Sequence, residues 1–114
     1  MNEFKKEYIK LIKKMNQGYI ARSEFEEFVS KHKEMEYFKE AILTLMDSDD
    51  PWVMVLSADC CIEYDIDMKK ARRVIKYILR HVPFDLYTIE AENVLIKYRR
   101  KKLNIIKKLR GKKK

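Results

Sequence analysis

The chain has 114 residues, of which 46% are hydrophobic and 39% are charged, and its formal net charge is +8. A chain of this length predicts one domain with its own hydrophobic core. Two glycines and two prolines are too few for the many turns of an all-β domain, so the composition favours an all-α fold of charged helices.

The sequence shows no targeting or membrane-spanning segment. The first residues lack the apolar stretch of a secretory signal peptide, and no apolar run approaches the roughly 18 residues of a transmembrane helix. The two cysteines, Cys60 and Cys61, are neighbours and therefore cannot easily form a disulfide on a helix. Two free thiols suit a reducing compartment, so we expect a cytoplasmic protein.

The charge is segregated along the chain. Residues 97–114 contain eleven basic residues and no acidic ones, whereas residues 24–67 contain thirteen acidic and three basic residues. The net charge of +8 therefore describes neither region, and each must be considered as a separate surface.

Apolar residues at spacings of three and four predict three helices in the first half of the chain. The first covers residues 3–16 and stops before Gly18. The second begins at Ser23, where Ser-Glu-Phe-Glu is typical of a capping box, or earlier at Tyr19. The third covers residues 36–46.

Three further helices are expected in the second half. Asp50 and Pro51 predict the start of a fourth helix, with Asp50 as its N-cap. This helix runs to about Tyr64 and is apolar nearly all round, which predicts a central position. A fifth spans residues 68–80, and a sixth begins near Phe84 and reaches residue 100 or beyond.

The six helices show a weak internal repeat. The shift that places Ile42 on Ile75 also places Val53 on Leu86, so apolar positions of the third and fourth helices fall on those of the fifth and sixth. Three helical hairpins therefore follow one another in residues 1–100, and an irregular six-helix bundle is the alternative. Residues 101–114 form a basic C-terminal tail, expected to be helical and then frayed from Gly111.

The segment from Phe38 to Ala58 combines an apolar helix, an Asp-rich turn and a second helix that opens with Pro51 and Val53. This pattern resembles a HEAT-type repeat, and residues 19–100 resemble short bacterial HEAT-like proteins of unassigned function. Some of those are encoded beside polymorphic toxins and are thought to act as immunity proteins. The resemblance implies an α-solenoid of about three stacked hairpins and a role in partner binding. Met54 departs from the pattern, which often has Arg there.

Acidic residues recur on the second helices of the hairpins, which line a concave face in stacked hairpins. The shift found for the apolar positions also relates Glu26, Asp59 and Glu92, and the spacings along the fourth and sixth helices add further members. The partner-binding hypothesis is an acidic ladder with an aromatic anchor, made of Glu26, Trp52, Asp59, Glu63, Asp85 and Glu92. A basic protein such as a toxin would be its partner. An ordinary solvated face is the alternative interpretation.

A second hypothesis concerns the basic residues. The fifth helix and the start of the tail carry a cationic set that could bind nucleic acid, made of Lys69, Arg72, Arg73, Lys76, Arg80, Arg99, Arg100, Lys101 and Lys102. The tail is also a basic amphipathic helix that could rest on an anionic membrane surface. A solvated terminus, or docking onto an acidic face of this chain or a second copy, remains open.

The sequence contains no motif for catalysis. Neither GxSxG, HExxH, a P-loop nor GxGxxG occurs, and the cysteines lack metal-ligand spacing. Ser57, Asp59 and a histidine are the residue types of a catalytic triad. His32 and His81 are expected at helix ends, however, where their positive charge suits the helix dipole, so we do not expect a triad. We therefore expect a non-catalytic protein without cofactor or metal.

Overall fold

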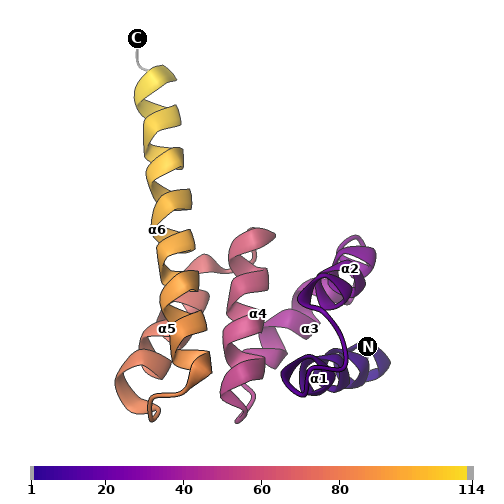
Figure 1. The fold of residues 1–114 in the computed structure, drawn as a ribbon. Helices are drawn as coiled ribbons and strands as arrows, with labels where there is room; N and C mark the ends of the chain where they lie inside the picture. The colour runs from indigo at the N-terminus through magenta and orange to yellow at the C-terminus, as the bar shows by residue number, and fades with distance from the viewer. Residues whose placement is uncertain (1, 113–114) are drawn as a thin grey trace.

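The computed structural model describes residues 2–112, and within this range every regular element is a helix (Figure 1). The prediction of an all-helical chain is confirmed. In chain order the helices are α1 (Asn2–Asn16), α2 (Arg22–His32), α3 (Phe38–Leu45), α4 (Pro51–Glu63), α5 (Met68–His81) and α6 (Leu86–Lys112).

The first helix ends at Asn16 as expected, two residues before Gly18. This glycine has φ +82°, a left-handed conformation that costs other residues more. Its N–H donates to the carbonyl of Met15, and the N–H of Tyr19 donates to that of Lys14. These two bonds satisfy carbonyls left open at the helix end and turn the chain towards α2.

The expected capping box at Ser23 is wrong. The N-cap of α2 is Ala21, which has no side chain able to cap, and Ser23 lies inside the helix. The third helix is also shorter than expected. The N–H of Met35 donates to the carbonyl of His32, and that of Phe38 donates to the carbonyl of Met35, so the chain keeps turning until α3 begins.

The prediction for the start of α4 is confirmed. The side chain of Asp50 accepts a 2.9 Å hydrogen bond from the backbone N–H of Trp52, and Pro51 occupies the first helical position. The cap satisfies one of the N–H groups that a helix leaves open, and proline has no N–H to satisfy.

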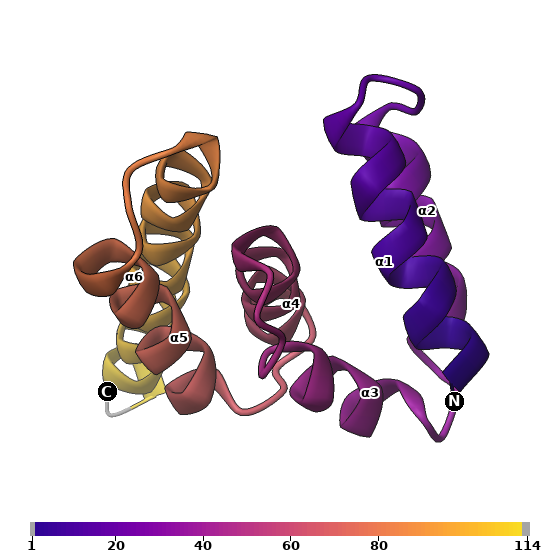
Figure 2. The ribbon, with the colours of Figure 1, turned by 90° about the horizontal axis from the view of Figure 1, so that it is seen from below.

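Helix α4 is the centre of the molecule. It packs against α1, α3, α5 and α6, and eight of its thirteen residues are buried. In Figure 2, α4 lies between the α1/α2 pair and the α5/α6 pair. This position follows from its sequence, because a helix that is apolar nearly all round can bury its surface only with neighbours on several sides.

Tyr8 ties the first hairpin to this centre. Its side chain on α1 is fully buried, and its hydroxyl lies 3.1 Å from the hydroxyl of Ser57 and 3.7 Å from the sulfur of Cys60. Burial raises the pKa of Tyr8 well above its ordinary value, so the phenol stays protonated and can donate. A buried hydroxyl needs such partners to offset its desolvation.

Helix α6 is the longest element, and its C-terminal part rises beyond every other helix (Figure 1). The same helix continues across residues 100 and 101 and reaches Lys112, and Lys113 and Lys114 lie outside the described residues. No helix within residues 2–112 combines the length and the apolar character needed to cross a bilayer.

Replacing Asp50 by alanine should destabilise the protein by about 1 kcal/mol, because the N-cap hydrogen bond at the start of α4 is lost. The matched control is Asp49→Ala, which removes an exposed carboxylate one residue earlier that does not cap the helix. Chemical unfolding measures both changes. Equal effects of the two variants would show that Asp50 contributes charge rather than a cap.

Candidate protein-binding groove

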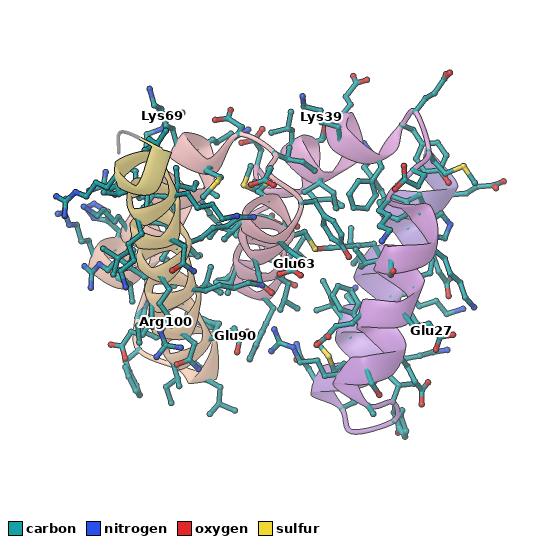
Figure 3. All side chains as sticks on the ribbon, turned by 90° about the horizontal axis from the view of Figure 1, so that it is seen from above. Glu27, Lys39, Glu63, Lys69, Glu90 and Arg100 are labelled. Carbon is teal, nitrogen blue, oxygen red and sulfur yellow. The ribbon has the colours of Figure 1, made fainter. Side chains whose placement is uncertain are left out.

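A groove of about 420 Å³ lies between α2, α4 and α6. Helix α4 forms its floor, and α2 and α6 form its two walls. In Figure 3, Glu63 and Glu90 lie on the sides of α4 and α6 that face α2, whereas Glu27 lies on the outer side of α2. The groove is therefore built from the second helix of each successive pair.

The lining positions follow one pattern on all three helices. Each helix contributes four residues at positions i, i+3, i+4 and i+7, which share one side of a helix. They are Arg22, Phe25, Glu26 and Val29 on α2; Leu56, Asp59, Cys60 and Glu63 on α4; and Glu90, Asn93, Val94 and Lys97 on α6. Arg22, Leu56 and Glu90 are thus equivalent. The spacing between these equivalent residues is one position longer than the shift that relates the apolar residues.

The groove contains more negative than positive charge. Four carboxylates line it, from Glu26, Asp59, Glu63 and Glu90, and they face only two cations, Arg22 and Lys97. With Tyr64 as the remaining lining residue, the formal charge of the groove is therefore −2.

Arg22 joins all three helices across the groove. Its guanidinium lies 2.6 Å from Glu90 on α6, 3.6 Å from Asp59 on α4 and 3.2 Å from Glu26 one turn along α2. The hydrogen bond to Glu90 raises the pKa of Arg22. The arginine side chain keeps 41% of its surface exposed, so solvent reaches this network and weakens it.

Lys97 forms the second network, on the α6 wall. Its ammonium lies 3.0 Å from Asp59 and 2.6 Å from Glu63. Burial alone would lower the pKa of Lys97, but the hydrogen bonds to Glu63 and Asp59 outweigh it, and the pKa is raised. The same contact with Lys97 lowers the pKa of Glu63. Asp59 is thus shared between the two cations.

Below the charged rim the groove is apolar. Phe25 and Val29 on α2, Leu56 on α4 and Val94 on α6 belong to the buried core and also line the groove. A side chain that entered would meet carboxylates at the rim and apolar surface beneath. This combination suits the long arginine or lysine side chain, which has an apolar stem and a charged head.

The structure brings together half of the residues in the expected acidic ladder. Glu26, Asp59 and Glu63 line the groove. The sequence interpretation missed Glu90, Arg22 and Lys97. No local pattern marks Arg22 and Glu90 as partners, because they belong to the second and the last helix of the chain and only the fold brings them into contact.

The other three residues of the ladder lie outside the groove. Trp52 packs edge-to-face on Tyr87 of α6, with ring centroids 6.2 Å apart. Asp85 accepts a hydrogen bond from the N–H of Leu86 at the start of α6. Glu92 is exposed on another side of α6, because the groove position equivalent to Asp59 on that helix is Asn93.

The basic residues of the second hypothesis gather on α5 and the middle of α6. Lys101 binds within the molecule, to Asp65 at 2.9 Å and to the carbonyl of Ile62. Within residues 2–112 the other eight form no ion pair with a carboxylate, namely Lys69, Arg72, Arg73, Lys76, Arg80, Arg99, Arg100 and Lys102. Lys76 has a lowered pKa because Arg72 lies nearby, with Arg80 and Arg99 adding to the effect.

Ser57, Asp59 and the histidines are not assembled into a triad. Ser57 is buried and hydrogen-bonded to Tyr8. His32 donates a hydrogen bond from Nδ1 to the carbonyl of Phe28 near the end of α2. His81 ends α5 and packs on Tyr77. Among the described residues, His, Cys, Asp and Glu side chains form no group of three that could hold a metal ion.

Comparisons of the chain with family models, with curated proteins and with solved structures gave no match.

Replacing Lys97 by methionine should raise the pKa of Glu63 towards its ordinary value, because the hydrogen bond that favours the carboxylate is lost. In the native protein the lowered pKa of Glu63 stabilises the fold fully above the ordinary pKa of about 4.3, and this contribution is lost as the pH falls through the lowered pKa. An NMR titration of the Glu63 carboxyl carbon measures the shift.

Lys102→Met is the control for this titration, since Lys102 is exposed and forms no ion pair with a carboxylate within residues 2–112. It should leave the Glu63 titration unchanged. An equal rise of the Glu63 pKa in both variants would mean that the general positive charge of α6, and not the Lys97 contact, sets the titration.

Proposed function

We propose that the protein is a non-catalytic binding module and that the groove between α2, α4 and α6 takes up a cationic segment of a partner protein. The observation that carries the proposal is the surplus of carboxylates in the groove, four against two cations, above buried apolar lining residues. A basic toxin is a partner of this kind, as the resemblance to HEAT-like immunity proteins implies.

The arrangement of the second helices supports a HEAT-like stacking of the three hairpins. Helices α2, α4 and α6 line one groove with the same four positions, at an equal spacing along the chain. In α-solenoids the equivalent helices of successive repeats form such a concave surface, and binding sites lie there. We therefore propose an α-solenoid of three hairpins as the scaffold that carries the site.

Binding in this groove would be an exchange of cations. Arg22 and Lys97 already neutralise part of the charge, and both side chains are about two-fifths exposed. An arginine of the partner could take the place of Arg22 on Glu90 and Asp59 without leaving a buried charge unpaired. The net gain would then come from the surplus negative charge of the groove and from apolar contacts beneath its carboxylates.

The surroundings of the groove would speed the encounter. Residues 24–67, which supply most of α2 and all of α3 and α4, carry thirteen acidic and three basic residues, a charge balance of −10. A field of one sign attracts partners of the opposite sign and raises their association rate, most strongly at low salt. The rate of association should therefore fall as salt is added.

The cysteines support a reducing compartment, which we propose is the cytoplasm. Cys60 and Cys61 are both free and buried. Burial raises the pKa of each thiol to about 12, so neither forms the reactive thiolate at neutral pH. They act as small core side chains.

The test is capture of a partner from a nuclease-treated lysate of the source organism by native and variant protein. The groove variant combines Glu26→Lys and Glu63→Lys, two exposed carboxylates of the groove. The control variant combines Glu24→Lys and Glu92→Lys, two exposed carboxylates outside it with the same total charge change. A partner held by the groove should be retained by the native protein and the control and lost with the groove variant, because its cations would meet lysines.

Circular dichroism should show the same helix content for all three proteins, since the substituted side chains are exposed. Loss of the captured protein with both variants would mean that it responds only to overall charge. Retention by the groove variant would place the binding surface elsewhere and contradict the proposal.

A further inference from the structure

The last part of α6, residues 102–112 (the extension), projects from the body of the protein (Figure 1). Lys101 reaches the carbonyl of Ile62 near the C-terminal end of α4, and beyond that point α6 continues to Lys112 (Figure 1). The extension is a continuation of the same helix that supplies one wall of the groove. In this helix the extension leads away from that groove (Figure 1).

An apolar stripe runs along the extension. Its members have 43–56% of their surface exposed and are Leu103, Ile105, Ile106 and Leu109. Residues seven apart lie on the same side of a helix, so Ile105 continues the side of Tyr98, which is buried against the body. Ile105 thus prolongs the packed side of α6 past the point where the body ends, whereas Leu103 and Ile106 continue the exposed side of Ile96 and Arg99. Nothing in residues 2–112 covers the stripe.

Cations surround this stripe. Lys102 and Arg110 lie among the apolar residues, and Lys107 and Lys108 lie on the other side of the extension. No acidic residue follows Glu92 in the chain. The extension is therefore amphipathic: its apolar side chains lie on one half of the helix together with Lys102 and Arg110, and its other polar residues are basic or neutral.

Basic residues of α5 lie near the side of α6 that Ile106 continues. The charges of Arg72, Arg80 and Arg99 all act on Lys76, and Ile106 follows Arg99 by two helical turns. A surface that covered the stripe could thus also meet these basic residues of α5, whose charges have no carboxylate partner within the described chain.

We propose that the extension, together with the basic side of α5, docks on an anionic lipid bilayer. The four apolar side chains would enter the boundary between headgroups and acyl chains. The lysines and arginines around them would extend their charged ends to lipid phosphates and carboxylates. The surface combines cations with an exposed apolar stripe. A bilayer with anionic lipids offers a partner to both, because its headgroups attract the cations and its acyl boundary accepts the apolar side chains.

Two other occupants fit the surface less well. A nucleic acid would bind the cations but leave the stripe in water, and residues 99–114 contain no aromatic side chain for base stacking. A second copy of the chain could cover the stripe with its own, but it would place two extensions without acidic residues against each other. The basic residues of two such extensions would repel one another in close contact.

Co-sedimentation with vesicles tests the proposal. The full chain is mixed with vesicles of phosphatidylcholine alone or of phosphatidylcholine with phosphatidylserine. The native protein should bind the mixed vesicles strongly and the neutral ones weakly. The stripe variant combines Leu103→Gln, Ile106→Gln and Leu109→Gln, and its affinity for the mixed vesicles should fall about tenfold or more, because insertion into the acyl boundary is lost.

The control variant is Tyr19→Gln, Met35→Gln and Phe84→Gln, which removes three exposed apolar side chains outside the extension. It should bind as the native protein does. Glutamine is a good helix former, so the stripe variant should keep its helix content by circular dichroism. The Glu26→Lys/Glu63→Lys groove variant should also bind vesicles, which separates this proposal from that for the groove.

Three outcomes would overturn the proposal. Equal vesicle binding by the native protein and the stripe variant would show that the cations alone make the contact. Duplex DNA that competes fully for the native protein and binds the stripe variant equally well would show that phosphate of any source is the ligand. A dimer in sedimentation analysis that dissociates with the stripe variant would show that a second copy covers the stripe.

Discussion

The structure depends on the burial of α4. Eight of its thirteen residues are buried, and a helix of this composition is stable only when other helices surround it. Helices α1, α3, α5 and α6 pack on it directly. The hydrogen bond between Tyr8 and Ser57 gives the contact with α1 a polar partner inside the core, which favours one arrangement of the first hairpin over others.

The groove follows from the same constraint. The polar residues Asp59 and Glu63 give α4 one side that is not apolar, and this side is left open between α2 and α6. Carboxylates there need cations, and the flanking helices supply Arg22 and Lys97. Two cations do not neutralise four carboxylates. The open side of the central helix therefore belongs to a surface with a net negative charge. Binding of a cationic partner would complete that balance.

The sequence predicted the helical class and most of the helices because their determinants are local. The cap at Asp50, the left-handed glycine at Gly18 and the apolar character of α4 act within a few residues, and each has the expected place. The site was only half predictable. The partners of Arg22 come from distant helices, and Glu92 was chosen by a repeat spacing one position too short for the groove. The positions of apolar residues along a helix predict which of its sides is buried. An error of one position in the repeat spacing, however, selects a side chain that points about 100° away around the helix.

The central claim is that the unbalanced carboxylates of the groove bind cationic chains, and amide chemical-shift mapping with an arginine-rich peptide tests it most directly. The account predicts saturable shifts confined to residues 22–29, 56–63 and 90–97, the three lining segments. The turn at Asp47, Asp49 and Asp50 offers an equally acidic control surface outside the groove. Shifts that centre on this turn, or that spread evenly over all acidic residues, would contradict the account.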